Sequence, residues 1–125
     1  MKLLLDTHVM LWCLANDARL KGEARDLIRD PENAVFVSAA SMWEVAIKRA
    51  LGRIEIDLAL LDDALDAMGF EHLAIIGRHA LGVADLPAHH NDPFDRMLVA
   101  QSIHEGMRLV THDAAVARYG TALLI

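Results

Sequence analysis

Short apolar runs alternate with stretches of helical periodicity along the whole chain, and this alternation most constrains the fold. Lys2–Leu5 and Ala34–Val37 are apolar runs of strand length, whereas the apolar residues of Leu58–Met68 recur at helical spacing. Parallel strands need long crossover connections, and a helix between two strands provides one. The pattern therefore predicts an α/β fold in three layers, α/β/α, around a central parallel sheet of about five strands.

Turn and capping residues set the boundaries of these elements. Gly69 and Gly106 each close a helix, and Asp92-Pro93 opens one, with proline in the favoured first turn. The predicted strands are Lys2–Leu5, Ala34–Val37, Phe70–Ile75, Arg108–Val110 and Thr121–Leu124. The predicted helices are Val9–Ala15, Gly22–Arg29, one that follows Ser38–Ser41 and ends near Gly52, Leu58–Met68, Arg78–Val83, Asp92–Gly106 and Asp113–Tyr119. No linker interrupts the series, so residues 1–125 form a single domain.

The charge balance limits the classes of partner. The chain has 12 Lys and Arg against 18 Asp and Glu, so its formal charge is 12 − 18 = −6, which argues against nucleic-acid binding by bulk charge. An acidic site that reaches phosphate through bound metal stays possible. Hydrophobic residues make up 54% of this small chain, so we expect apolar patches that a second copy or another protein covers.

Cysteine usage and apolar run length indicate the compartment. The single Cys13 excludes an internal disulfide and a multi-thiolate zinc site. No uncharged stretch approaches the roughly 20 residues that a bilayer span needs. We therefore expect a cytoplasmic protein without a transmembrane helix.

Four acidic residues fall where a parallel α/β fold builds its sites. Asp6 closes the first strand, and Asp113 follows the strand Arg108–Val110. Glu44 and Asp95 are expected in the first turns of two helices that begin at the same edge of the sheet. Ligands bind at the carboxyl edge of open parallel sheets, so the four acids can converge there. Clustered carboxylates repel one another unless a cation neutralises them, and an all-oxygen donor set suits Mg²⁺ or Mn²⁺.

Two of these acids have competing structural interpretations of unequal weight. Ser41-x-x-Glu44 matches a capping box, and Glu44 can also pair with Lys48 one turn later. Asp6 is harder to explain structurally, because an acid at the end of a buried strand loses hydration and has no basic residue nearby in the sequence. Asp6 is therefore the strongest single indication of function.

The other two acids fit helix caps equally well. Asp92 is a good N-cap, and Asp95 then lies in the first turn, facing the positive end of the helix dipole. Asp113 can cap the last helix in the same way. Position alone leaves capping and metal binding open for these residues.

Four segments together resemble the ordered motifs of PIN-domain ribonucleases, specifically the VapC-type toxins of type II toxin–antitoxin systems. The resemblance runs nearly from end to end, and its two middle motifs are specific over eight or more positions. It implies that Asp6, Glu44, Asp95 and Asp113 are the catalytic and metal-binding residues, supported by the Thr7 and Thr111 hydroxyls. The segments are Leu3–His8, Ser38–Val45, His89–Gln101 and Thr111–Asp113.

The resemblance also implies an activity and partners. The implied activity is that of a Mg²⁺- or Mn²⁺-dependent endoribonuclease that cuts structured RNA, often a tRNA. The implied partners are a VapB-type antitoxin, which silences the enzyme, and a second copy of the chain in a homodimer. The antitoxin and dimer contacts are expected around the helix Val9–Ala15, with Leu20, Leu27 and Ile28. The alternative is a catalytically silent PIN-like module that binds RNA or protein. His89 and His90 lack a zinc-ligand spacing and are interpreted as loop residues, while His8 and His112 are expected to border the site.

Overall fold

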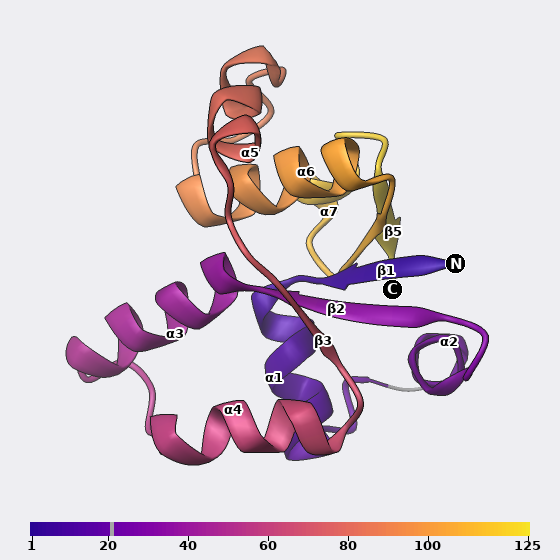
Figure 1. Cartoon of the computed structure of the whole chain (residues 1–125), viewed down its shortest axis with the longest axis vertical. Helices are drawn as coiled ribbons and strands as arrows, with labels where there is room; N and C mark the ends of the chain where they lie inside the picture. Colours follow the sequence, from indigo (N-terminus) through magenta and orange to yellow (C-terminus); the bar gives the residue numbers. More distant parts are fainter. Residues whose placement is uncertain (21) are drawn as a thin grey trace.

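The computed structural model describes residues 1–20 and 22–125 and contains a five-stranded parallel sheet in the order β3-β2-β1-β4-β5 (Figure 1). Helices lie on both faces of this sheet, as expected for a three-layer α/β/α fold. The strands are β1 (Lys2–Leu5), β2 (Ala34–Ser38), β3 (Glu71–Leu73), β4 (Arg108–Thr111) and β5 (Ala122–Leu124). The helices are α1 (Thr7–Ala15), α2 (Glu23–Arg29), α3 (Ala39–Ala50), α4 (Leu58–Ala67), α5 (Gly77–Gly82), the 3₁₀ turn η1 (Val83–Asp85), α6 (Pro93–Glu105) and α7 (Ala114–Ala117).

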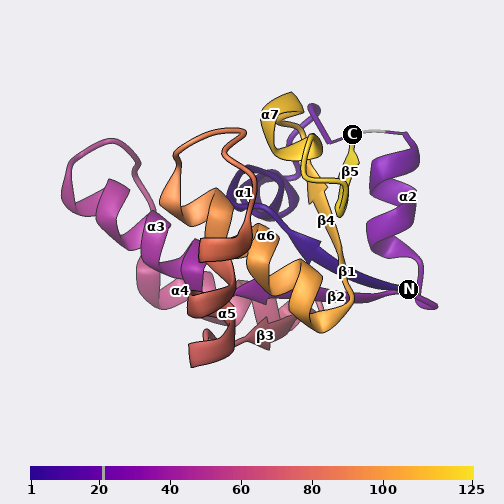
Figure 2. The same cartoon turned by 90° about the horizontal axis from the view of Figure 1, so that it is seen from above.

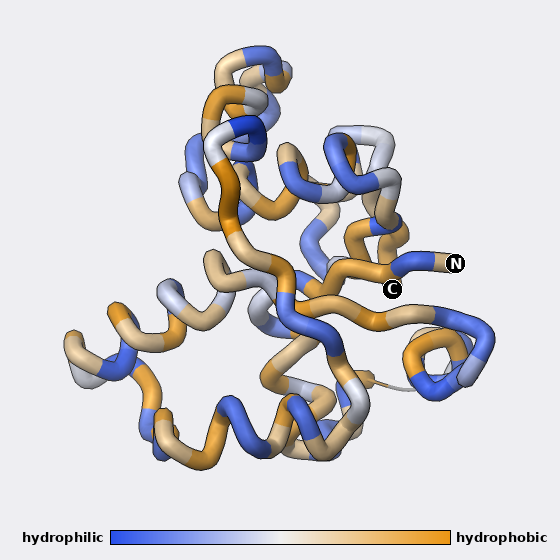
Figure 3. The backbone as a smooth tube through the Cα atoms, in the orientation of Figure 1, coloured by the Kyte–Doolittle hydropathy of each residue, from blue (hydrophilic) through white to orange (hydrophobic). Residues whose placement is uncertain are grey.

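The strand β1 is central because both of its faces are apolar. It pairs with β2 on one side and with β4 on the other. Leu3 and Leu5 point into one core cluster and Leu4 into the other, and all three are fully buried. Figure 3 shows the apolar colour along β1 beyond its first residues, flanked by the polar turn that precedes β2. The predicted interior strand is thus confirmed.

Each face of the sheet has its own helical layer. The first core cluster joins β1 and β2 to α1, α2 and α4, whereas the second joins β1 and β4 to α6 and α7. Figure 1 shows these two groups of helices on opposite sides of the strands, and Figure 2 gives the view from above, with α6 drawn across the sheet. In α4, Leu61 and Leu65 face the sheet at helical spacing and are buried, as the sequence pattern predicts. Among the described residues, no helix is both long and apolar enough to cross a bilayer.

The third strand is shorter than predicted. The sequence predicts Phe70–Ile75, but only Glu71–Leu73 pairs, along β2. Beyond Leu73 the chain leaves the sheet, and the carbonyl of Ala74 accepts a hydrogen bond from Gln101 Nε2 on α6 at 3.3 Å. A side chain of another layer therefore replaces the strand partner.

Four helices begin at or near the edge where the parallel strands end. Asp6 caps α1 directly after β1, and Ser38 caps α3 directly after β2. Asp92 caps α6, with Pro93 in the first position, and Asp113 caps α7 after β4. These caps direct the helix N-termini toward one edge of the sheet, where their partial positive charges favour acidic groups.

Candidate active site

Asp6 is held at the end of β1 by two hydrogen bonds. Its Oδ1 accepts from the backbone N–H of Val9 at 2.8 Å, and its Oδ2 accepts from the Thr111 hydroxyl at 2.5 Å. Burial raises the pKa of Asp6, and this effect outweighs the opposing hydrogen bonds from Thr111 and Val9. Asp6 is therefore a structural N-cap as well as a candidate ligand, a role that sequence reasoning did not assign to it.

Thr111 also connects Asp6 to Asp113. The Thr111 oxygen accepts a hydrogen bond from the Asp113 N–H at 3.0 Å while its hydroxyl donates to Asp6. Asp113 itself caps α7, because its side chain accepts a hydrogen bond from the N–H of Ala115 at 2.8 Å. Asp113 is exposed to solvent. One buried hydroxyl thus links the acids that follow β1 and β4.

Glu44 is held differently from the prediction. It lies in the second turn of α3, because Ser38, and not Ser41, is the N-cap. The predicted Ser41–Glu44 capping box is therefore wrong. Instead, Glu44 Oε1 accepts from the Thr7 hydroxyl at 2.6 Å and Oε2 pairs with Lys48 at 2.7 Å. The predicted pairing with Lys48 is confirmed, and Glu44 is buried at the base of α3.

Asp95 carries the clearest electrostatic signal of the cluster. It lies in the first turn of α6, where its N–H donates to Asp92 Oδ1 at 2.9 Å. Its pKa is raised to about 6, first by burial and then by the negative charges of Asp92, Asp6 and Glu44, with His90 acting in the opposite direction. Asp6 and Glu44 therefore both lie within electrostatic range of Asp95.

Asp113 approaches this group from the other side of Asp6. Together with Asp6, it lines a pocket of about 250 Å³ whose wall includes His8, Trp12 and His112, so both histidines border the site as expected. Within the residues that the structure describes, no three of the four acids present oxygens within 4.8 Å of one another. The four carboxylates therefore lie around a common site without being close enough, in this arrangement, to share one bound ion between three of them.

The one compact group of possible ligands in the described chain lies elsewhere, between α5 and α6. His79, His104 and Glu105 offer atoms within 4.8 Å of one another. However, His79 Nδ1 accepts from the backbone N–H of Ile76 at 3.1 Å, so the neutral ring carries its proton on Nε2, which faces Glu105 at 3.6 Å. A protonated Nε2 has no lone pair to offer a metal, and this group is better described as a contact between two helices.

Several basic residues near the acidic site are engaged in contacts within the chain. Arg96 donates from Nη1 to the carbonyl of Pro87 at 3.0 Å and from Nη2 to the carbonyl of Val83 at 3.2 Å. Arg49 donates to the carbonyl of Ile56, and Lys48 pairs with Glu44. Arg96 is therefore a structural clamp on the loop before α6.

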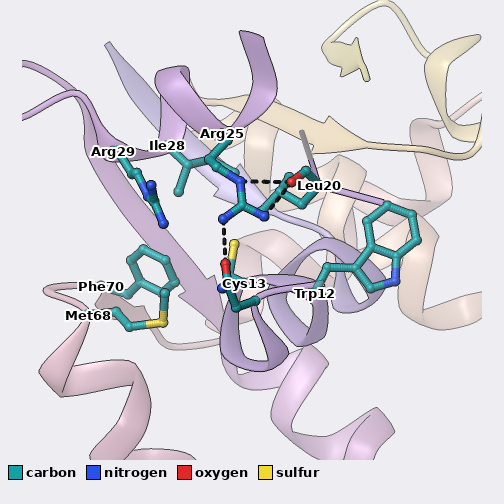
Figure 4. A pocket seen from close by; sticks show the side chains of 9 residues that line it. Trp12, Cys13, Leu20, Arg25, Ile28, Arg29, Met68 and Phe70 are labelled. Atoms are coloured by element: carbon teal, nitrogen blue, oxygen red, sulfur yellow. Dashed lines mark hydrogen bonds between the residues drawn. The ribbon is translucent and has the colours of Figure 1, made fainter. Parts of the chain in front are cut away.

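The predicted apolar contact surface is mostly internal. Leu20 and Ile28 are buried in the first core cluster. They nevertheless form part of the wall of a cavity of about 230 Å³ between α1, α2 and the start of β3 (Figure 4). Arg25 is fixed at its edge by hydrogen bonds to the Leu20 carbonyl and to Asn16 Oδ1. The largest exposed apolar side chains lie on other elements, at Trp43 and Leu81 among others.

Comparison with known proteins identifies the family. The profile of the PIN domain matches residues 3–122. The chain belongs to the PIN domain family. Among PIN domain proteins, it is 33% identical over 114 residues to ribonuclease VapC22 of Mycobacterium tuberculosis, a match that covers 88% of this chain and 85% of that protein. The recognition of a VapC-like sequence from its four motifs is therefore confirmed.

Solved structures of PIN domain proteins share the fold. The VapBC2 complex of Rickettsia felis, solved with a DNA fragment from its promoter, contains a chain that superimposes with a TM-score of 0.72 at 14% identity, covering 100% of this chain and 98% of that one. VapBC-1 of nontypeable Haemophilus influenzae gives a TM-score of 0.66 at 15% identity, covering 99% and 98%. At these identities the likeness establishes the three-layer PIN fold.

Proposed function

We propose that this PIN domain protein is a metal-dependent endoribonuclease, the toxin of a VapBC-type toxin–antitoxin system, acting on structured RNA such as tRNA in the cytoplasm. The observation that carries the proposal is the convergence of Asp6, Glu44 and Asp95, whose mutual repulsion contributes to the raised pKa of Asp95. A structural cap does not require three acids to share one edge of the sheet. Asp113, beside Asp6, completes the proposed set of catalytic and metal-binding residues.

The donor set fits Mg²⁺ or Mn²⁺. All four proposed ligands are carboxylates, and every oxygen that already accepts a hydrogen bond keeps a second lone pair. The negative charge is only partly neutralised, since Lys48 contacts Glu44 alone among the four acids. When bound, a divalent ion supplies an activated water and neutralises charge on the cleaved phosphate.

The residues of this chain hold and orient that site. Thr111 fixes one oxygen of Asp6, Thr7 fixes one oxygen of Glu44, and Asp92 caps the helix that carries Asp95. The Asp6 and Glu44 side chains are thus positioned by buried contacts before any ligand arrives, which lowers the entropic cost of binding. A hydrolytic reaction of this kind needs no histidine as general base.

RNA cleavage tests the proposal directly. Asp6→Asn and Asp95→Asn are expected to abolish Mg²⁺-dependent cleavage, and EDTA is expected to stop the wild-type reaction. Asp57→Asn is the matched control. Asp57 is also a helix N-cap, but its carboxylate accepts hydrogen bonds from the first backbone N–H groups of α4 and is not one of the four proposed ligands. Products should carry 5′-phosphate and 3′-hydroxyl ends. Cyclic 2′,3′-phosphate ends would overturn the metal-dependent route.

Binding without cleavage would support the alternative function. If the wild-type chain neither takes up Mn²⁺ in isothermal titration nor cuts RNA, the fold serves as a catalytically silent binding module. In that case the clustered acids Asp6, Glu44 and Asp95 would have no role in catalysis. Sequencing of RNA 5′ ends after brief induction of the chain would identify the substrate.

The proposed partners match two apolar surfaces. The cavity of Figure 4 has an apolar floor that includes Trp12 and Phe70 and a basic residue, Arg29, at its side, so it suits an apolar and acidic segment of an antitoxin. A second copy of the chain is proposed to cover Trp43, Ile76 and Leu81, which are 60%, 46% and 77% exposed. Exposed apolar side chains of this size usually mark an interface.

A further inference from the structure

His90 contains a buried polar atom that the structure leaves without a partner. Its Nε2 is inaccessible to solvent and makes no hydrogen bond among the described residues. This atom lies 3.4 Å from Oδ2 of Asp95, the acid at the start of α6. A buried N–H without an acceptor costs about 1–3 kcal/mol, so an arrangement of this kind calls for an explanation.

The neighbouring side chains determine which ring nitrogen of His90 carries the proton. His90 Nδ1 lies 2.9 Å from the Tyr119 hydroxyl, and Arg96 Nη1 donates to that same hydroxyl at 3.0 Å. Because a guanidinium can only donate, the Tyr119 oxygen accepts from Arg96, and its proton is free to be donated to His90 Nδ1, which we take as the acceptor. Nδ1 is then unprotonated, and the ring proton lies on Nε2, directed at Asp95.

Further contacts hold the side chains of Arg96, Tyr119 and His90 in place. Arg96 also donates to the carbonyl oxygens of Val83, Pro87 and His90, which fixes the loop before α6. His90 further packs on the Tyr119 ring at a centroid distance of 5.3 Å. The Nε2 proton of His90 is therefore held in place from behind.

We infer that His90 is a positioning residue for Asp95: its Nε2–H holds one carboxylate oxygen so that the other faces the metal. This inference rests on the proposed metal-dependent function. A small turn of the Asp95 carboxylate toward His90 satisfies the orphaned N–H and fixes the ligand at once. Groups that orient metal ligands in this way commonly contribute 10- to 100-fold to metal affinity.

Mn²⁺ binding measured by isothermal titration, without RNA, tests the inference. His90→Ala is expected to weaken Mn²⁺ binding about 10- to 100-fold. His90→Gln, whose side-chain amide can replace the Nε2–H, is expected to restore binding to within a few-fold of wild type. His89→Ala is the matched control, because His89 packs on the same Tyr119 ring at 4.8 Å, whereas among the described residues the histidine that pairs with Asp95 is His90.

Tyr119→Phe distinguishes positioning from general structural support. It removes only the hydroxyl that accepts from Arg96 and donates to His90, so it should weaken Mn²⁺ binding in the wild-type background and have no further effect in His90→Ala. Side-chain ¹⁵N shifts of His90 should show the proton on Nε2 in the wild type and a mixture of tautomers in Tyr119→Phe. Thermal unfolding in EDTA checks that each variant is folded.

Two results would overturn the inference while leaving the proposed nuclease intact. One is wild-type Mn²⁺ affinity in His90→Ala, and the other is an equal loss of affinity from Tyr119→Phe in both backgrounds. If the wild-type chain itself binds no Mn²⁺, the metal-dependent function and the inference fail together. The same titration therefore separates the two failures.

Discussion

Asp95→Asn should stabilise the metal-free protein at neutral pH, although most substitutions at a well-packed position destabilise. The pKa of Asp95 is raised from its usual value of 3.8 to about 6. Between about pH 4 and pH 6 the folded state therefore binds a proton that the unfolded state has lost, and stability falls as the pH rises through this range. At about 1.4 kcal/mol per pH unit, the ionised Asp95 carboxylate, buried among other acids, costs about 3 kcal/mol of folding free energy at pH 7.

The net gain is smaller because Asp95 also faces a helix N-terminus. Loss of a negative charge in the first turn of α6 removes about 0.3–1 kcal/mol of favourable interaction with the helix dipole. A net stabilisation of about 2 kcal/mol remains, which corresponds to a rise in Tm of about 6 °C for a domain of this size. The gain should disappear at pH 4, where the wild-type carboxyl is already protonated.

Thermal and urea unfolding in EDTA at pH 4 and pH 7 measures this effect. Asp26→Asn is the control, since Asp26 is also an acid in a first turn, on α2, but is exposed. It should lose the dipole interaction while leaving the acidic cluster around Asp95 unchanged, and so it should not show the gain in stability expected for Asp95→Asn. If Asp95→Asn is no more stable than wild type at pH 7, or if its advantage persists at pH 4, burial and the neighbouring acids do not raise the pKa of Asp95 as argued.

Two further predictions concern cations at the same cluster. Mn²⁺ affinity, measured by titration calorimetry, should fall up to about tenfold per pH unit below pH 6, because Asp95 must lose its proton to bind metal. Affinity that is flat from pH 7 to pH 5 would remove Asp95 from the ligand set. If an antitoxin places a basic side chain among the acids, millimolar Mg²⁺ should relieve its inhibition of cleavage while the complex stays associated in size-exclusion chromatography. Inhibition that is indifferent to Mg²⁺ would restrict the antitoxin to the apolar cavity.

The positions of most elements could be predicted because they depend on local patterns. The apolar run of β1 and the helical spacing in α4 are properties of consecutive residues, and so are the N-caps at Asp92 and Asp113. The start of α3 could not be fixed in this way. Ser38 and Ser41 are both acceptable caps, and the choice depends on the end of β2 and on a hydrogen bond from Ser38 to Gln101 on a distant helix.

The side-chain contacts of the site could not be predicted from patterns of neighbouring residues, because they join residues far apart in the sequence. Thr7 and Thr111 were expected to support the acids only through a family resemblance, and the pairing of each with its acid depends on how β1, α3 and β4 lie side by side. The network of Arg96, Tyr119 and His90 spans 29 positions from His90 to Tyr119. No spacing rule links such residues, so sequence reasoning left His90 as a loop residue.

The order of strands has a consequence for the time at which the acidic site is completed during synthesis. The strand β1 emerges early, yet one of its two partners is β4, and Thr111 follows Asp6 by 105 positions. At about 5–20 residues per second, a ribosome needs about 5–20 s to supply that second edge. Until then Asp6 lacks its hydroxyl partner and Asp113 is absent. If the proposed nuclease function holds, the acidic site of a nascent chain is completed only after β4 and Thr111 have left the ribosome.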